Sequence, residues 1–206
     1  MKNTVDYKLY LVTDRDILKD RDICAAVEEA IKGGVTVVQL REKNVSTLEF
    51  YNIAVKVKKV TDKYNVPLII NDRLDVGLSI DAAGIHVGQG DMPAEVARRL
   101  VGDTKVLGVS AATVEEAKKA EAAGADYIGV GAMFPTTTKN DATAVSIELL
   151  KKIKESVDIP VIAIGGINSN NVSVLNSAKI DGIAVISDIL GKEDIKGAAE
   201  KLISLV

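Results

Sequence analysis

Eight short apolar segments, rich in valine and isoleucine, alternate along the chain with longer amphipathic segments. Most of the apolar segments are too short and too uniformly apolar to be surface helices. Uninterrupted apolar character is instead typical of strands that are covered on both faces, as in a parallel sheet. The predicted strands are 8–13, 35–40, 66–71, 84–87, 105–110, 126–131, 160–165 and 182–187.

Helix signals occur in the segments between these strands. Ser46 and Glu49 have the spacing of a capping box. Thr113 and Glu116 have the same spacing, and Gly124 then provides a typical helix stop. We predict helices over 22–34, 46–64 and 113–124, a weaker one over 72–84, and others that begin near Pro93, Ser146, Ser169 and Glu193.

Eight strand–helix units predict an α/β protein with a (β/α)8 TIM barrel fold, in a single domain over residues 1–206. A doubly wound open sheet is the main alternative, although it usually has fewer strands. Such sheets often bind dinucleotides through a G-x-G-x-x-G motif that opens a helix. The segment 129–134, "GVGAMF", has only the first two glycines of that motif, and no helix pattern follows it directly.

Composition and charge argue against several classes of partner. The net charge is -3 with acids and bases interspersed, and aromatic residues make up 3% of the chain, so neither a basic nor a stacking surface for nucleic acid is expected. Cys24 is the only cysteine, which excludes a disulfide framework, and we expect it at a buried helix position. Without a signal-peptide pattern or an apolar span of about 20 residues, we expect a cytoplasmic protein with no membrane partner.

Polar residues collect after the predicted strands, where a barrel of this kind has its active site. This distribution predicts an active site rather than a scaffold. In strand order the segments are "QLREK" after the second strand, "NDR" after the third, "HVGQGD" after the fourth, Ser110 at the end of the fifth, "FPTTTKND" after the sixth, "GGINSNN" after the seventh and "ISD" after the eighth.

Gln39, Arg41 and Lys43 alternate across the end of the second strand, and a period of two would place them on one face. Arginine offers a planar fork to phosphate oxygens, and lysine offers a compact charge. The alternative is that the three side chains point outward to the helices and solvent. Because the strand is otherwise apolar, we favour a site for a polyanion.

Asp72 and Asp91 follow neighbouring strands, so we expect their carboxylates to lie near each other. Two acids beside a positively charged rim predict Mg²⁺, which proteins hold with one or two carboxylates, water and substrate phosphates. A glycosidase-like acid–base pair and ordinary capping or turn roles are the alternatives. His86 is the only histidine and cannot build a multi-histidine metal site; a hydrogen-bonded structural role is at least as consistent with it as acid–base chemistry.

A second anion site is expected after the seventh and eighth strands, at 165–167 and 186–188, because loops at these positions often bind phosphate and glycine allows close approach of the backbone. The loop at 131–145 is longer than the usual connection of about 2–6 residues, which favours a functional loop or lid. Two anion sites, one of them beside a metal, predict a transferase or lyase that acts on phosphorylated small molecules.

The motifs, taken in order, resemble those of the thiamin-phosphate synthase family. They are "LYLVTD", "QLREK", "NDR", "HVGQGD", "GVS", "FPTTTKND", "IGGI" and "VIS". The resemblance spans essentially the whole chain, and "QLREK" together with "FPT-x-TK" is its most specific part. It implies a (β/α)8 barrel that joins 4-amino-5-hydroxymethyl-2-methylpyrimidine diphosphate to 4-methyl-5-(2-phosphoethyl)thiazole, or its carboxylated form. It also implies a dissociative mechanism that releases pyrophosphate with the help of Mg²⁺.

Carried over by position, the resemblance implies a role for each motif. The diphosphate contacts are Gln39, Arg41, Lys43, Asn71 and Lys139, with Leu40 and Glu42 in the same binding segment. The Mg²⁺ ligands are Asp72 and Asp91, and the pyrimidine contact is Ser110. The thiazole-phosphate contacts are Thr136, Thr138, Gly166, Ile186 and Ser187, with Thr137 in the same loop or facing water. The predicted catalytic residues are Arg41, Lys43, Ser110 and Lys139.

Three other functions are compatible with the same barrel. A thiazole tautomerase would not need the acid pair or the basic segment. A sugar-phosphate epimerase or isomerase would need an acid–base pair and would have no use for "QLREK". A catalytically silent phosphate-binding barrel would not need the full set of rim residues. The sequence leaves a homo-oligomer open.

Overall fold

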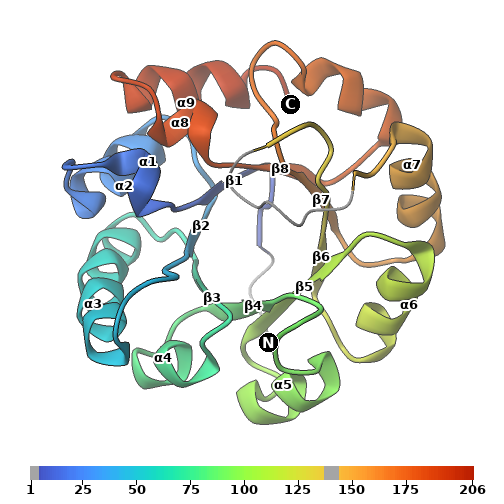
Figure 1. The fold of residues 1–206 in the computed structure, drawn as a ribbon, viewed down its shortest axis with the longest axis horizontal. Helices are drawn as coiled ribbons and strands as arrows, with labels where there is room; N and C mark the ends of the chain where they lie inside the picture. The colour runs from blue at the N-terminus through green and yellow to red at the C-terminus, as the bar shows by residue number, and fades with distance from the viewer. Residues whose placement is uncertain (1–4, 137–143) are drawn as a thin grey trace.

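The computed structural model describes residues 5–136 and 144–206. Its centre is a closed barrel of eight parallel strands, in which β8 pairs with β1 to complete the ring, and helices surround this barrel (Figure 1). Because the ring is closed, the predicted (β/α)8 TIM barrel is confirmed and the open sheet is excluded. The strands are β1 Leu9–Val12, β2 Val37–Leu40, β3 Leu68–Asn71, β4 Gly84–Val87, β5 Val106–Ala111, β6 Tyr127–Val130, β7 Val161–Ile164 and β8 Gly182–Val185.

The helices follow the predicted pattern with two differences. The segment after β7 forms a 3₁₀ helix rather than an α-helix, and short helices that the sequence did not signal follow β1 and β8. The elements are α1 Arg15–Leu18, α2 Ile23–Lys32, α3 Thr47–Lys63, α4 Leu74–Ser79, α5 Ala94–Val101, α6 Val114–Ala122, α7 Ile147–Ser156, the 3₁₀ helix η1 Val172–Ala178, α8 Ser187–Leu190 and α9 Ile195–Ile203.

The two predicted capping boxes differ in the role of the glutamate. At the start of α6, Thr113 Oγ1 accepts a hydrogen bond from the Glu116 amide at 3.1 Å, and the Glu116 carboxylate accepts one from the Ala112 amide at 2.6 Å. At the start of α3, Ser46 Oγ accepts from the Glu49 amide at 3.1 Å, but the Glu49 carboxylate pairs with an arginine on α1. Only the hydroxyl half of the box therefore forms at both helices, because the Glu116 carboxylate binds the amide of the residue before the cap and the Glu49 carboxylate links two helices.

Tyrosine and aliphatic side chains together fill the inside of the barrel. The hydroxyl oxygens of Tyr10 on β1 and Tyr127 on β6 lie 2.7 Å apart, although these strands are not neighbours in the ring, so the two side chains meet across the interior. On either side of Tyr10, Leu9 and Leu11 belong to the other apolar layer, between the strands and the helices. This alternation follows the period of two in a strand. Burial of each large apolar side chain contributes about 1.5–3 kcal/mol.

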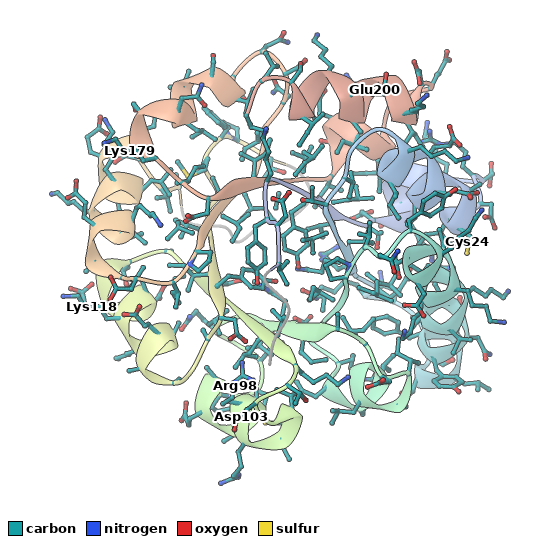
Figure 2. The ribbon with its side chains drawn as sticks, turned by 180° about the vertical axis from the view of Figure 1, so that it is seen from behind. Cys24, Arg98, Asp103, Lys118, Lys179 and Glu200 are labelled. Atoms are coloured by element: carbon teal, nitrogen blue, oxygen red, sulfur yellow. The ribbon has the colours of Figure 1, made fainter. Side chains whose placement is uncertain are left out.

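The periphery of the molecule is mostly polar, as Figure 2 shows from the other side of the barrel. Cys24 lies on the outer helix α2 and is half-buried rather than buried, which corrects the expectation from the sequence. Desolvation and the nearby Asp22 raise the pKa of its thiol, so the neutral form is favoured. Within the described residues, every helix is too short or too polar to cross a membrane.

Candidate active site

A continuous chain of hydrogen-bonded side chains crosses the barrel interior. Gln39 Nε2 donates to the Tyr10 hydroxyl at 2.9 Å, and the Tyr10 hydroxyl lies 2.7 Å from that of Tyr127. The Tyr127 hydroxyl lies 3.0 Å from His86 Nδ1. His86 Nε2 in turn lies 3.0 Å from Ser110 Oγ. Side chains of β2, β1, β6, β4 and β5 thus connect two predicted substrate contacts, one at each end.

The sequence reasoning missed two members of this chain, Tyr10 and Tyr127. Burial raises the pKa of both hydroxyls, so each carries its proton at neutral pH and can donate one hydrogen bond. Both ring nitrogens of His86 have a hydrogen-bond partner, as the structural interpretation of this residue requires. One of these partners is Ser110, which is a predicted contact to substrate. The sequence signal that could have identified both tyrosines is a hydroxyl group within an otherwise apolar predicted strand.

Arg41 and Lys43 reach the rim of the barrel but point toward different neighbours. The Arg41 guanidinium lies 3.0 Å from the Asp14 carboxylate, on the loop after β1. The Lys43 ammonium lies 2.8 Å from the Asp72 carboxylate, on the loop after β3. Gln39 points inside the barrel. Arg41 and Lys43 lie beyond the end of β2 at Leu40, and their partners come from the loops after the strands on either side of β2, so a shared face for the three side chains stays a prediction.

Leu40 and Glu42 turn away from the mouth of the barrel. The Leu40 side chain is fully buried in the apolar layer between strands and helices, so any contact with a ligand would use its backbone. The Glu42 side chain is 3% exposed and lies 3.0 Å from the Arg15 guanidinium. Burial raises the pKa of this carboxyl against the effect of Arg15. Its Oε1 atom is buried without a hydrogen-bond partner among the described residues.

Asp72 and Asp91 come together at the ends of β3 and β4. Partial desolvation, and then the adjacent Asp72, raise the pKa of the Asp91 carboxyl, because two like charges disfavour each other. The Asp72 amide donates to the His86 carbonyl at 2.8 Å, and Asp91 accepts from the Gly88 amide at 2.8 Å. Among the described residues, no group of three or more His, Cys, Asp or Glu side chains is arranged to hold a metal. Any metal here would need ligands from water or substrate.

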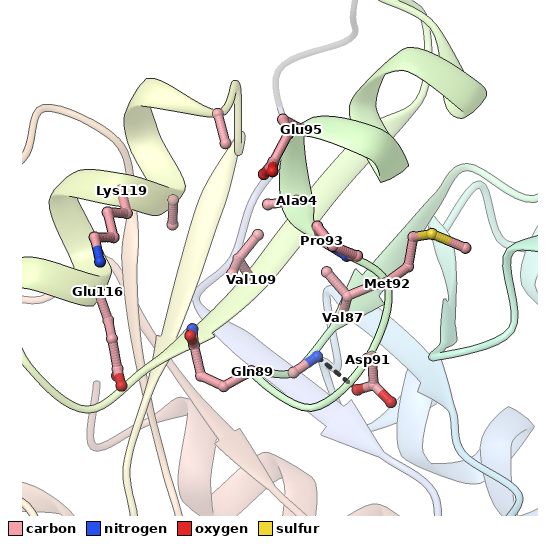
Figure 3. A pocket seen from close by; sticks show the side chains of 13 residues that line it. Val87, Gln89, Asp91, Met92, Pro93, Ala94, Glu95, Val109, Glu116 and Lys119 are labelled. Atoms are coloured by element: carbon pink, nitrogen blue, oxygen red, sulfur yellow. Dashed lines mark hydrogen bonds between the residues drawn. The ribbon is translucent and has the colours of Figure 1, made fainter.

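A pocket of about 250 Å³ lies beside Asp91, between the loop after β4 and helix α6 (Figure 3). Gln89 and Asp91 line it from the loop, and Glu116 and Lys119 line it from α6. Gln89 also donates to the Ser110 carbonyl at 2.6 Å. The pocket thus lies next to the acid pair but outside the strands, between two of the surrounding helices, rather than on the barrel axis.

The loop after β6 continues alongside the end of β7. The Met133 amide donates to the Ile164 carbonyl and the Phe134 amide to the Gly165 carbonyl, both at 3.0 Å. Gly166 has a φ of +65°, and a Cβ atom there would lie 2.6 Å from the Pro135 carbonyl oxygen. Glycine is therefore required at this position by the backbone of the β6 loop as well as by the turn.

Thr136 is the last described residue before the gap, next to this contact. Ile186 and Ser187 lie at the end of β8, where Ile186 precedes α8 and Ser187 is exposed. The Ser169 amide donates to the Asp188 carboxylate at 2.8 Å, so the loops after β7 and β8 are linked. Thr137, Thr138 and Lys139 lie outside the described residues. Asn71 is the last residue of β3 and is buried beside His86 in the strand register.

A comparison with protein families decides between the barrel functions. Residues 9–189 match the model of the thiamine monophosphate synthase family. The chain belongs to the thiamine monophosphate synthase family. The resemblance drawn from the motifs is confirmed, and with it the prediction of an enzyme, a transferase of thiamin biosynthesis.

Relatives of the thiamine monophosphate synthase family match along nearly the full chain. The thiamine-phosphate synthase of Clostridium tetani is 63% identical over 198 residues, which cover 96% of this chain and 95% of the relative. That of Methanobrevibacter smithii is 56% identical and covers 98% of this chain and 96% of the relative. The solved structure of thiamine phosphate pyrophosphorylase from Pyrococcus furiosus is 42% identical with a TM-score of 0.90, over 97% of this chain and 95% of that one.

Proposed function

We propose that the protein joins 4-amino-5-hydroxymethyl-2-methylpyrimidine diphosphate to 4-methyl-5-(2-phosphoethyl)thiazole, or its carboxylated form, to give thiamin phosphate and pyrophosphate. The observation that carries this proposal is the pair Asp72 and Asp91 beside Lys43, in a chain of the thiamine monophosphate synthase family. Acids and a cation at one rim suit a metal-bound diphosphate. The names of the relatives support the product.

Mg²⁺ is the metal that the acid pair would suit. Both ligands are hard oxygen donors. Desolvation and then the adjacent Asp72 raise the pKa of the Asp91 carboxyl, and a divalent cation would relieve the repulsion between the two acids. Asp72 and Asp91 would hold the ion and leave its other positions to water and to diphosphate oxygens. When bound, Mg²⁺ would offset negative charge on the leaving diphosphate.

Arg41 and Lys43 would bind the diphosphate after exchanging their present partners. Each now pairs with a carboxylate, Asp14 or Asp72, which keeps the cation at the rim before substrate arrives. A charge contact near 4 Å is worth about 4 kcal/mol at an effective dielectric constant of about 20. A tenfold change in rate needs only about 1.4 kcal/mol. Even partial strengthening of these contacts as pyrophosphate leaves would therefore be enough for a large acceleration.

The thiazole phosphate would bind on the opposite part of the rim. Gly166, Ile186 and Ser187 come from the loops after β7 and β8, and the pairing of the β6 loop with β7 supports a place for Thr136 beside them. Thr138 would act from the same loop. Lys139 would contact the diphosphate, so that one loop serves both substrates.

The reaction requires positioning more than covalent help from the protein. The aminopyrimidine can stabilise a benzylic-type cation when pyrophosphate leaves, so no nucleophilic side chain is needed. Ser110 would hold the pyrimidine ring, and the rim residues would hold the two phosphorylated groups. This division fits a site made of hydrogen-bond donors, cations and an acid pair.

The decisive experiment mixes the purified protein with Mg²⁺ and both substrates. We expect thiamin phosphate and pyrophosphate to form in equal amounts, and formation to stop when Mg²⁺ is removed with a chelator. No product above a control without enzyme would reject the proposal. Conversion of one thiazole isomer to another in the same mixture, without pyrophosphate, would indicate the tautomerase instead.

A further inference from the structure

The hydrogen-bond chain inside the barrel has a direction. Gln39 presents its amide nitrogen to Tyr10, so the Tyr10 oxygen accepts at that end. Its single proton is then donated to Tyr127, and the Tyr127 proton to His86 Nδ1. In neutral imidazole only one nitrogen carries hydrogen, so His86 Nε2–H donates to Ser110 Oγ. The Ser110 proton is not used within the chain.

We propose that this one-way chain fixes His86 as the Nε2–H tautomer and thereby makes Ser110 a hydrogen-bond donor to an unprotonated nitrogen of the substrate's pyrimidine ring. Tyr10, Tyr127 and His86 are thus positioning residues, since they act on the ligand through Ser110. The identity of the ligand rests on the proposed function. The direction of the chain rests only on the described side chains.

Because the tyrosine hydroxyls are buried, the two possible directions of proton donation along the chain differ in free energy. Tyr10 is 1% exposed and Tyr127 is 1% exposed, so neither hydroxyl can turn to water for a partner. If the protons ran the other way while Gln39 still donated, the Tyr10 proton would have no acceptor within the chain. Because the reverse direction would leave this buried donor unsatisfied, the first direction is favoured by roughly tenfold or more. Burial also raises the pKa of both hydroxyls, which keeps their protons in place.

Glycine residues on the flanking strands leave room for the rings of this chain. Gly108 lies between His86 and Tyr127 in the strand register. A Cβ atom at Gly108 would lie 2.3 Å from the Tyr127 hydroxyl oxygen and 2.5 Å from His86 Nδ1. A Cβ atom at Gly129 would lie 3.3 Å from the His86 ring. The contact between the His86 and Tyr127 rings therefore depends on glycine, which has no side chain, at position 108.

The first test reads the tautomer directly. His86 is the only histidine, so protein labelled with ¹⁵N-histidine gives one pair of ring-nitrogen signals. In the substrate-free enzyme at neutral pH we expect a protonated Nε2 and an unprotonated Nδ1. A protonated Nδ1, which would follow from a Gln39 amide turned by half a rotation, would overturn the proposal, and so would an imidazolium with both nitrogens protonated.

The second test asks whether the tyrosines set the tautomer. Tyr127→Phe removes the donor to His86 Nδ1, and we expect the Nδ1–H form to become populated. Tyr7→Phe is the matched control, because the Tyr7 ring lies 4.8 Å from that of Tyr127 but its hydroxyl is not a member of the chain. An unchanged tautomer in Tyr127→Phe, or an equal change in Tyr7→Phe, would refute the role given to the chain.

The third test is a double-mutant cycle on substrate binding. Tyr127→Phe should raise the KM for the pyrimidine diphosphate by about tenfold and leave that for the thiazole phosphate unchanged. In a Ser110→Ala background the same change should have no further effect, because both remove one interaction. Additive losses would show a purely structural role. If the wild-type enzyme forms no product, the proposed function and the ligand of Ser110 both fail, whereas the tautomer still decides the direction of the chain.

Discussion

The Lys43 ammonium lies 2.8 Å from the carboxylate of Asp72, so a proposed diphosphate contact and a proposed Mg²⁺ ligand neutralise each other before substrate binds. Binding of metal and diphosphate would therefore separate an ion pair rather than fill two independent sites. Because the pair is half exposed on the lysine side, this separation should be easy. The relationship makes the roles of the two residues separable by experiment.

Replacement of Asp72 by asparagine should have opposite effects with and without metal. Asp72→Asn releases Lys43 and removes one negative charge, so inorganic pyrophosphate should bind a few-fold more tightly without Mg²⁺. The tightening that Mg²⁺ causes in the wild type should disappear. Titration calorimetry with pyrophosphate measures both. Asp103→Asn, an exposed change of the same charge after α5, is the control, and equal behaviour of the two variants would contradict the assignment.

Removal of the second acid should act on the metal alone. Asp91→Ala should raise the Mg²⁺ concentration needed for half-maximal turnover by at least about tenfold, or abolish turnover, because one of two proposed protein ligands is lost. A metal titration of the rate measures this. Unchanged dependence on Mg²⁺ would remove Asp91 from the metal site.

Arg41→Ala should weaken one substrate selectively. The loss of a charged hydrogen bond, about 1.5–3 kcal/mol, corresponds to roughly 10- to 100-fold weaker binding of the pyrimidine diphosphate. Binding of the thiazole phosphate should stay within about twofold. Separate calorimetric titrations compare the two, with Arg99→Ala on the exposed face of α5 as the control for charge. Equal losses for both substrates would contradict the two-site arrangement.

Gly108→Ala should destabilise the barrel from inside. The added Cβ would lie 2.2 Å from the Tyr127 ring, and overpacking of this kind costs about 1–3 kcal/mol. For a chain of this size we expect Tm to fall by roughly 2–10 °C. Gly90→Ala is the control, because its Cβ would meet no atom of residues 5–136 and 144–206 within 4 Å. Equal Tm values for the two variants would show that the tyrosine can move aside.

A pH-dependent contribution to stability is expected where α2 meets α3. Glu28 accepts hydrogen bonds from Lys63 and Tyr64, and these lower the pKa of its carboxyl to about 2. The ordinary pKa of a glutamate carboxyl is about 4.3. The contribution of Glu28 to folding stability is therefore complete above that pH and is lost as the pH falls through about 2. Glu28→Gln should therefore lower Tm near neutral pH and have no effect in strong acid. A Tm difference that is constant with pH would contradict this.

The barrel could be predicted from the sequence because its strands are marked locally. Uniform apolar runs such as 35–40 are followed by polar segments, and this pattern needs no knowledge of distant residues. The four-residue helices α1 and α8 were missed because four residues carry no measurable period. The segment after β7 has a helix-like pattern, but it winds as a 3₁₀ helix.

The arrangement of side chains at the rim was harder to predict. The different partners of Arg41 and Lys43 depend on where β2 ends and on which acids the neighbouring loops present. The contact between Tyr10 and Tyr127 joins residues 117 positions apart, and it exists only because the ring closes. Motifs can indicate which residues gather at one end of a barrel, whereas their partners are set by the three-dimensional register.

The tyrosines inside the barrel also determine how the folding of this protein can be observed. The chain has no tryptophan and five tyrosines, so its intrinsic fluorescence comes from tyrosine alone. Tyr7, Tyr10 and Tyr127 are packed together inside the ring of strands, whereas Tyr51 and Tyr64 lie on or next to the outer helix α3. The change in emission during refolding should therefore follow closure of the barrel more closely than docking of the helices around it.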